Sequence, residues 1–162
     1  MQNSNFEQIR PANATVITLD DLQNTTVSTG KSAMSLPYGS LIEIPADAIE
    51  GVIRVPVTIA GREIQSTRIP ATINGTDSYI SVNRFVGHIF ADETEEFDKL
   101  FANEPAKYAT MQQAGSAENL FDRVSALAGK KLRVSQRFTL PYTPYGKDKP
   151  SKRVFTAYED AQ

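Results

Sequence analysis

The chain lacks cysteine altogether and has a single histidine among its 162 residues. Without cysteine it can form no disulfide, thiolate zinc site or thiol nucleophile. A Ser-His-Asp triad or a histidine-containing metal site would have to use His88, which lies in an apolar, strand-like stretch and is interpreted as a partly buried structural residue. We therefore expect a protein that is not an enzyme, with no catalytic residues, no metal site and no cofactor.

Long apolar runs are missing as well. No stretch approaches the roughly 18 residues of a membrane-spanning helix. The start of the chain also lacks the basic segment and apolar core of a secretory signal. The sequence therefore predicts no membrane contact and a cytoplasmic location. Hydrophobic residues still make up 40% of the chain, which is enough to build a core.

Two short motifs are too incomplete to indicate a site. Residues 28–32 end like a phosphate-binding loop, but that pattern needs a glycine where this chain has Thr25. The acidic run 92–98 lacks the spacing of a calcium loop. We interpret it as the first turn of a helix, where negative charge is favourable, followed by a solvated surface.

Acidic and basic residues are divided unevenly along the chain. Residues 1–122 hold 8 Lys/Arg against 16 Asp/Glu, a formal balance of −8. Residues 123–162 hold 9 Lys/Arg against 3 Asp/Glu, a balance of +6, so the total of −2 hides a basic end behind an acidic body. Such a division favours contact of the basic end with an anionic partner or with an acidic protein surface.

Residues 36–91 show the pattern of short β-strands joined by tight turns. The expected strands are 41–44, 52–59, 62–69 and 78–82. Pro56 interrupts one of them and favours a sheet edge or a bulge. Ala60-Gly61 is predicted to be a hairpin turn between two of these strands. Asn74-Gly75 is the strongest turn signal, because both central residues of a type I′ turn need a positive φ.

Residues 92–129 have the periodicity of helices. Aromatic residues recur there at helical spacing and are interpreted as core rather than as a ligand pocket: Phe97, Phe101, Tyr108 and Phe121. Pro105 is expected to open one helix and Ser116 to cap the next. Gly129 is placed where a C-terminal glycine ends a helix.

Residues 130–160 are expected to form one long β-hairpin. Apolar residues from Leu132 to Leu140 alternate with Lys131, Arg133 and Arg137, so one face would pack and the other would carry three cations. The segment 141–152 is rich in proline and is predicted to be the connecting loop.

Together these patterns predict an α+β fold. We expect a small β-rich, OB-like barrel with a helical insertion at about 92–129 and a C-terminal β-hairpin. Residues 36–162 would form this single domain. Residues 1–35 are polar and would form a partly flexible N-terminal arm with one short strand, ordered only against a partner or a sheet edge.

The basic hairpin is the strongest candidate for a functional site. Its cations are mixed with aromatic rings, the combination that neutralises phosphates and stacks on unpaired bases. The candidate nucleic-acid-binding residues are Lys130, Lys131, Arg133, Arg137, Tyr142, Tyr145, Lys147, Lys149, Lys152, Arg153 and Phe155. The first hypothesis is therefore a non-enzymatic protein that binds single-stranded DNA or RNA and associates with itself.

A second hypothesis explains the same features without nucleic acid. A structural or assembly protein, such as a component of a virion, could use its N-terminal arm and its hairpin to contact neighbouring subunits. The acidic body of one subunit would then meet the basic extension of the next. The cations would also protect an exposed strand edge from aggregation.

Overall fold

The computed structural model describes residues 4–26, 36–82, 99, 102–142 and 151–161. Its strands are β1 Thr15–Val16, β2 Leu41–Glu43, β3 Ile53–Ile59, β4 Arg62–Ile73, β5 Thr76–Ser81, β6 Lys131–Tyr142 and β7 Ser151–Asp160. The other elements are α1 Ser4–Ile9, α2 Leu19–Asn24, the short 3-10 helix η1 Ala48–Gly51, α4 Ala109–Gly115 and α5 Leu120–Leu127. The fold is therefore mixed α and β, as expected from the sequence.

The seven strands form one antiparallel sheet. Its order is β1-β3-β4-β2-β6-β7, and β5 pairs with the other edge of β4. The long strand β4 pairs with β3 along its first half, and β2 continues along the same edge at Thr72 and Ile73. Pro70 falls in the gap between these two partners, where a residue without an N–H is tolerated in a strand.

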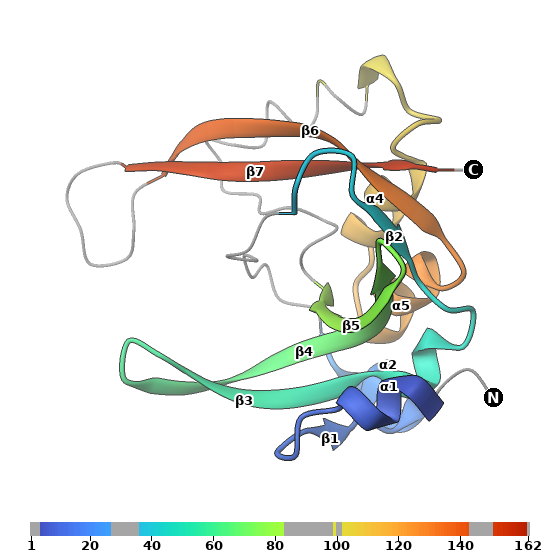
Figure 1. Ribbon diagram of the computed structural model, residues 1–162, viewed down its shortest axis with the longest axis vertical. Coiled ribbons are helices and arrows are strands. Elements are labelled where there is room, and N and C mark those ends of the chain that lie inside the picture. The colour runs from blue at the N-terminus through green and yellow to red at the C-terminus, as the bar shows by residue number, and fades with distance from the viewer. Residues whose placement is uncertain (1–3, 27–35, 83–98, 100–101, 143–150, 162) are drawn as a thin grey trace.

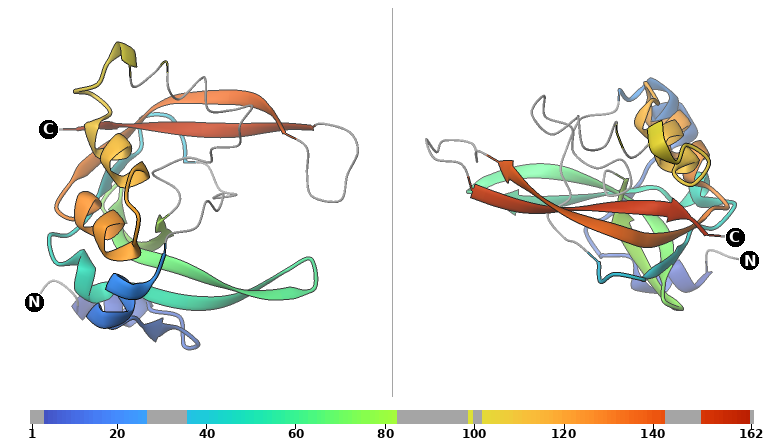
Figure 2. Two further views of the ribbon diagram at one scale, coloured as in Figure 1. Left: turned by 180° about the vertical axis from the view of Figure 1, so that it is seen from behind. Right: turned by 90° about the horizontal axis from the view of Figure 1, so that it is seen from above.

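The sheet does not close, so the expected barrel is not a sealed one. Within the described residues β7 pairs with β6 alone and β1 pairs with β3 alone, and these two strands end the path. Closure would require β7 to turn back towards β1. Instead, the β6–β7 and β3–β4 hairpins lie at opposite ends of the sheet and project in the same direction from a base that contains β2, β5, α4 and α5 (Figures 1 and 2).

The tight turns follow the local sequence. Ala60 and Gly61 have φ values of 53° and 77°, and Asn74 and Gly75 have values of 50° and 85°. Both pairs therefore have the positive φ values that a two-residue hairpin turn requires, which confirms the two predicted turns. Asn74 also ties its turn to β2, because its side-chain oxygen accepts a hydrogen bond from the Leu41 N–H at 2.9 Å.

The core lies between the curved base of the sheet and the two helices α4 and α5. Its sheet side includes Ile42, Ile69, Ala71, Ile80, Leu132, Val134 and Tyr158, and its helix side includes Met111, Ala114, Leu120, Val124 and Leu127. The apolar periodicity in the sequence predicted α5 well. That helix is capped by Asn119, whose side chain accepts the Asp122 N–H, and not by Ser116, which ends α4.

The first described residues are packed on the sheet. The short strand expected in the N-terminal arm is present as β1, and it is ordered against the edge of β3. Phe6, Ile17 and Leu22 are buried, and the last two belong to the core. Residues 4–26 are therefore part of the folded body, because three apolar side chains in a polar segment are enough to dock two short helices.

Candidate nucleic-acid interface

Three exposed cations lie where α5 ends and β6 begins: Lys130, Lys131 and Arg133, called the basal cations below. The backbone that carries them is held firmly. Gly129 ends α5 with a φ of 76°, as predicted, and its N–H donates to the Ile44 carbonyl. The Lys130 carbonyl in turn accepts the Ile44 N–H at 3.0 Å. The backbone that carries the basal cations is therefore held in a defined position.

The basal cations form no ion pair with any described residue. In the strand register Lys131 lies opposite Glu43 of β2, and Arg133 lies opposite Glu159 of β7. Glu159, however, is bound to Lys107 at 3.0 Å. The acidic neighbour of Arg133 is thus already neutralised, and among the described residues Glu43 forms no ion pair with Lys131, so these cations are available to an external anion.

A β-bulge at Ser135 changes the faces of the hairpin. Val134 pairs with Tyr158 and Gln136 pairs with Ala157, so Ser135 is an extra residue in β6. The partners of Arg133 and Arg137 are Glu159 and Thr156, three residues apart on a regular strand. Because successive positions alternate between faces, Arg137 occupies the face opposite to Arg133. The prediction that Lys131, Arg133 and Arg137 share one face is therefore wrong for Arg137, which follows the bulge.

The same shift brings other candidates onto one face. Phe155 and Arg153 lie four and six positions from Glu159 along β7, and Tyr142 pairs with Ser151, eight positions away. These even spacings place all three positions on the face of Arg133, whereas Lys152 falls on the face of Arg137. Sequence alternation alone could not reveal this grouping, because it assumed an unbroken period of two.

The remaining candidates divide between the core and the residues that are not described. Tyr145, Lys147, Lys149, His88, the motif 28–32, the acidic run 92–98, Phe97 and Phe101 lie outside the described residues. Tyr108 is buried and Phe121 packs against the core, as the sequence predicts for both. α4 begins at Ala109 rather than at Pro105, because residues 105–108 form a turn.

Tyr38 is a residue near the interface that the sequence analysis did not select. Among the large hydrophobic side chains that the structure describes, it is the most exposed, at 73%. The turn that carries it lies against β6, since the Gly39 N–H donates to the Val134 carbonyl at 2.9 Å. Its aromatic ring and the proline before it were visible signals. The contact of its turn with Arg133 was not, because the two segments are far apart in the sequence.

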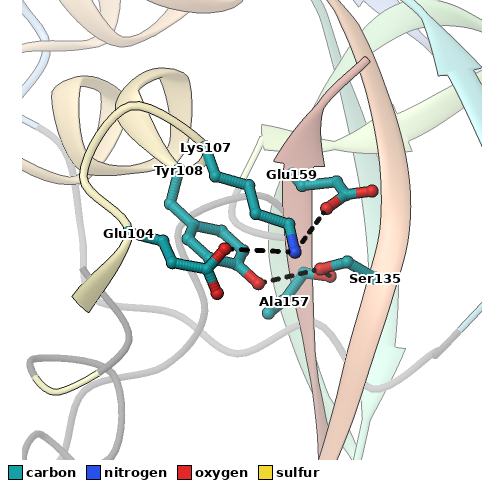
Figure 3. Close-up of polar contacts among 6 residues, drawn as sticks. All are labelled: Glu104, Lys107, Tyr108, Ser135, Ala157 and Glu159. Atoms are coloured by element: carbon teal, nitrogen blue, oxygen red, sulfur yellow. Dashed lines mark hydrogen bonds and ion pairs between the residues drawn. The ribbon is translucent and has the colours of Figure 1, made fainter.

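A polar network fixes the bulge against the segment before α4 (Figure 3). The hydroxyls of Tyr108 and Ser135 are hydrogen-bonded at 3.2 Å, and the Ser135 hydroxyl donates to the Ala157 carbonyl at 3.4 Å. Lys107 lies between Glu104 at 3.4 Å and Glu159 at 3.0 Å. The network therefore holds the start of the hairpin in one register.

Lys107 gives this network a pH dependence. The hydrogen bond to Glu159 raises the pKa of Lys107 above its usual value, despite the opposing effect of desolvation. Because the folded state favours the charged form, the stabilisation is complete below the ordinary lysine pKa of about 10.4 and is lost as the pH rises above it. The Lys107 side chain is 39% exposed and the pair is screened by solvent, so the effect is modest.

We predict that Glu159→Gln makes the thermal stability less sensitive to alkaline pH. The fall in Tm between pH 9 and pH 11 should be smaller than in the wild type, because the variant lacks the ion pair that high pH breaks. Thermal unfolding followed by circular dichroism measures this difference. The matched control is Glu118→Gln on an exposed residue, and an equal fall in all three proteins would contradict the role of the pair.

No helix in the described part of the chain is both long and apolar enough to span a bilayer. The same residues bring together no group of three or more His, Cys, Asp or Glu side chains that could hold a metal ion. Compared with known proteins, the chain matches no family model, no curated protein and no solved structure.

Proposed function

We propose that this chain is a non-enzymatic protein that binds single-stranded nucleic acid at the base of the β6–β7 hairpin and along one face of it. The observation that carries the proposal is the group of basal cations, which are exposed and have no ion-pair partner among the described residues. Phosphates would supply the missing anions, and the release of their counterions would favour binding.

The strand register of the hairpin favours binding of single-stranded nucleic acid rather than of a duplex. In the strand register, Phe155 and Tyr142 lie on the same face of the hairpin as Arg133 and Arg153. Aromatic and cationic positions therefore alternate along that face. Unpaired bases can stack on aromatic rings, whereas paired bases in a duplex cannot reach them. The acidic body would repel a strand elsewhere and would concentrate binding at the hairpin.

The open sheet also supports the proposal through its likeness to the binding surface of OB-type proteins. Such proteins bind single strands on a small, partly open, antiparallel β-structure. The open and curved antiparallel sheet of this chain offers a surface of the same general kind. Only the contact surface needs to be basic, so a net charge of −2 does not oppose the proposal.

Fluorescence anisotropy of a labelled single-stranded oligonucleotide tests the proposal. We expect binding that weakens steeply between about 50 and 200 mM salt, with a slope of about −0.7 in log K against log salt for each phosphate contact. A duplex of the same sequence is the control and should bind more weakly. Absence of single-strand binding at low salt would refute the proposed function.

Assembly through the hairpin is the second candidate function, and the position of β7 favours it. Within the described residues this ten-residue strand pairs with β6 alone and ends the sheet, so its outer edge could receive a strand from another subunit. Light scattering across the same salt range tests it. A defined oligomer without nucleic-acid binding would favour assembly, and a monomer at every concentration would exclude it.

A further inference from the structure

The turn Pro37–Ser40 holds a tyrosine ring in solvent. The Ser40 N–H donates to the Pro37 carbonyl at 3.1 Å, and the Ser40 hydroxyl donates to the same oxygen at 2.7 Å. Gly39 has a φ of 84°, which a type II turn requires at its third position. A Cβ at Gly39 would meet no atom within 4 Å, so glycine is needed here for its backbone conformation and not for space.

Two hydrogen bonds fasten this turn to β6, beside which it passes on its way to β2 (Figure 1). The Gly39 N–H donates to the Val134 carbonyl, and the Val134 N–H donates to the Ser40 carbonyl, both at 2.9 Å. The backbone under Tyr38 is therefore fixed. An exposed ring on a fixed backbone loses little conformational entropy when it binds, since only two side-chain torsions must be ordered.

The turn also lies beside a basal cation. Arg133 donates from Nη1 to the Gly39 carbonyl at 3.4 Å, so the guanidinium lies beside the residue that follows Tyr38. Lys131 lies two positions earlier on the same face of β6. The turn that carries Tyr38 and the strand that carries Lys131 and Arg133 are thus brought together from segments that are distant in the sequence.

Three of the other tyrosine rings are not available in this way. Tyr79 donates its hydroxyl to the Phe6 carbonyl and packs edge-on against the Phe6 ring at 6.0 Å. Tyr108 and Tyr158 are buried. Among the side chains that the structure describes, the remaining exposed large apolar ones are aliphatic and offer no π face for stacking: Ile9, Val16, Leu19 and Ile64.

We infer that Tyr38 is a base-stacking residue for single-stranded nucleic acid, and that Arg133 and Lys131 bind the phosphates on either side of the stacked base. This inference rests on the proposed function and deepens it. It assigns a defined position to one nucleotide at the base of the hairpin, outside the hairpin itself. Stacking on a ring is tolerant of base identity, so this position should bind any base.

Substitutions at Tyr38 test the inference in the full-length protein. We expect Tyr38→Ala and Tyr38→Leu to bind oligothymidine about tenfold more weakly than the wild type, because one stacked base is lost. Tyr38→Phe should bind like the wild type, since it keeps the ring. Ile64→Ala is the matched control, because it also truncates an exposed apolar side chain but lies on the β3–β4 hairpin, and it should leave affinity unchanged.

A fluorescent variant adds a direct measurement. The chain contains no tryptophan, so Tyr38→Trp introduces a single indole whose emission reports on this position alone. Saturation with oligothymidine should quench that emission, and the anisotropy of the labelled oligonucleotide should show affinity at least equal to that of the wild type. Quenching together with the loss in Tyr38→Ala would establish stacking.

The outcomes separate this inference from the proposed function. If the wild type binds and Tyr38→Ala and Tyr38→Leu bind equally well, the stacking role is overturned while the proposed function stands. If Tyr38→Leu binds like the wild type but Tyr38→Ala does not, the ring acts only through apolar area and stacking is again overturned. If the wild type fails to bind, both fail, and a change of oligomer mass in Tyr38→Ala would then identify a protein contact.

Discussion

The double charge reversal Lys131→Glu, Arg133→Glu is expected to weaken binding of a single-stranded oligonucleotide by about a hundredfold or more at low salt. Both side chains are exposed, share a face of β6 and lack an ion-pair partner among the described residues. Reversal removes two phosphate contacts and replaces them with repulsion. The slope of log K against log salt should become shallower by about 1.4, since each single-strand contact contributes about 0.7.

Two controls show whether this effect belongs to the interface. Arg62→Glu makes the same charge change at an exposed residue at the start of β4, in the hairpin that lies away from β6. Arg137→Glu makes it within β6 but on the opposite face position, beyond the bulge at Ser135. We expect single Arg133→Glu to weaken binding more than either control. Equal losses in all three would indicate a general charge effect and would sink the proposed interface.

Truncation of Ile42 to alanine is expected to lower the free energy of unfolding by about 2–5 kcal/mol, the usual cost of a large-to-small change in a packed core. Ile42 is fully buried in β2. This strand of only three residues pairs Ile42 with Ile73 of β4 and with Leu132 of β6. It is the strand through which the β3–β4 and β6–β7 hairpins belong to one sheet, so its packing supports both halves.

Urea unfolding followed by far-ultraviolet circular dichroism measures this loss as a lower midpoint with an unchanged slope. Ile64→Ala is the matched control, since it truncates the same side chain at a position that is 44% exposed, and it should shift the free energy of unfolding by no more than about 0.5 kcal/mol. If Ile42→Ala were as stable as this control, β2 could not be the junction that we describe.

The sequence predicted correctly the turns and the helix that depend on interactions between residues close together in the chain. Asn74 and Gly75 adopt positive φ, which few other residues tolerate. The turn could therefore be predicted from these two residues alone. α5 follows from the spacing of Leu120, Val124 and Leu127, which places them on one side of a helix. The basal cations were also visible, because unpaired charge is rarely buried.

Other features depend on contacts that a single segment does not encode. The bulge at Ser135 adds one residue to β6, and its hydroxyl is bonded to Tyr108 from the helical segment. The bulge decides which candidate positions share a face with Arg133. Closure of the sheet depends likewise on where the outer edges of β1 and β7 lie, and strand periodicity carries no information about this.

The sequence by itself determined that this chain is a folded α+β protein with an acidic body, a basic aromatic hairpin at its C-terminal end and tight turns at Ala60-Gly61 and Asn74-Gly75. Only the tertiary structure decided that the sheet stays open, that residues 4–26 join the body and that the turn carrying Tyr38 is hydrogen-bonded to Arg133 through the Gly39 carbonyl. The physical reason is the range of the interactions: backbone propensity, period and charge act within a few residues, whereas strand pairing and side-chain packing join residues that only folding brings together.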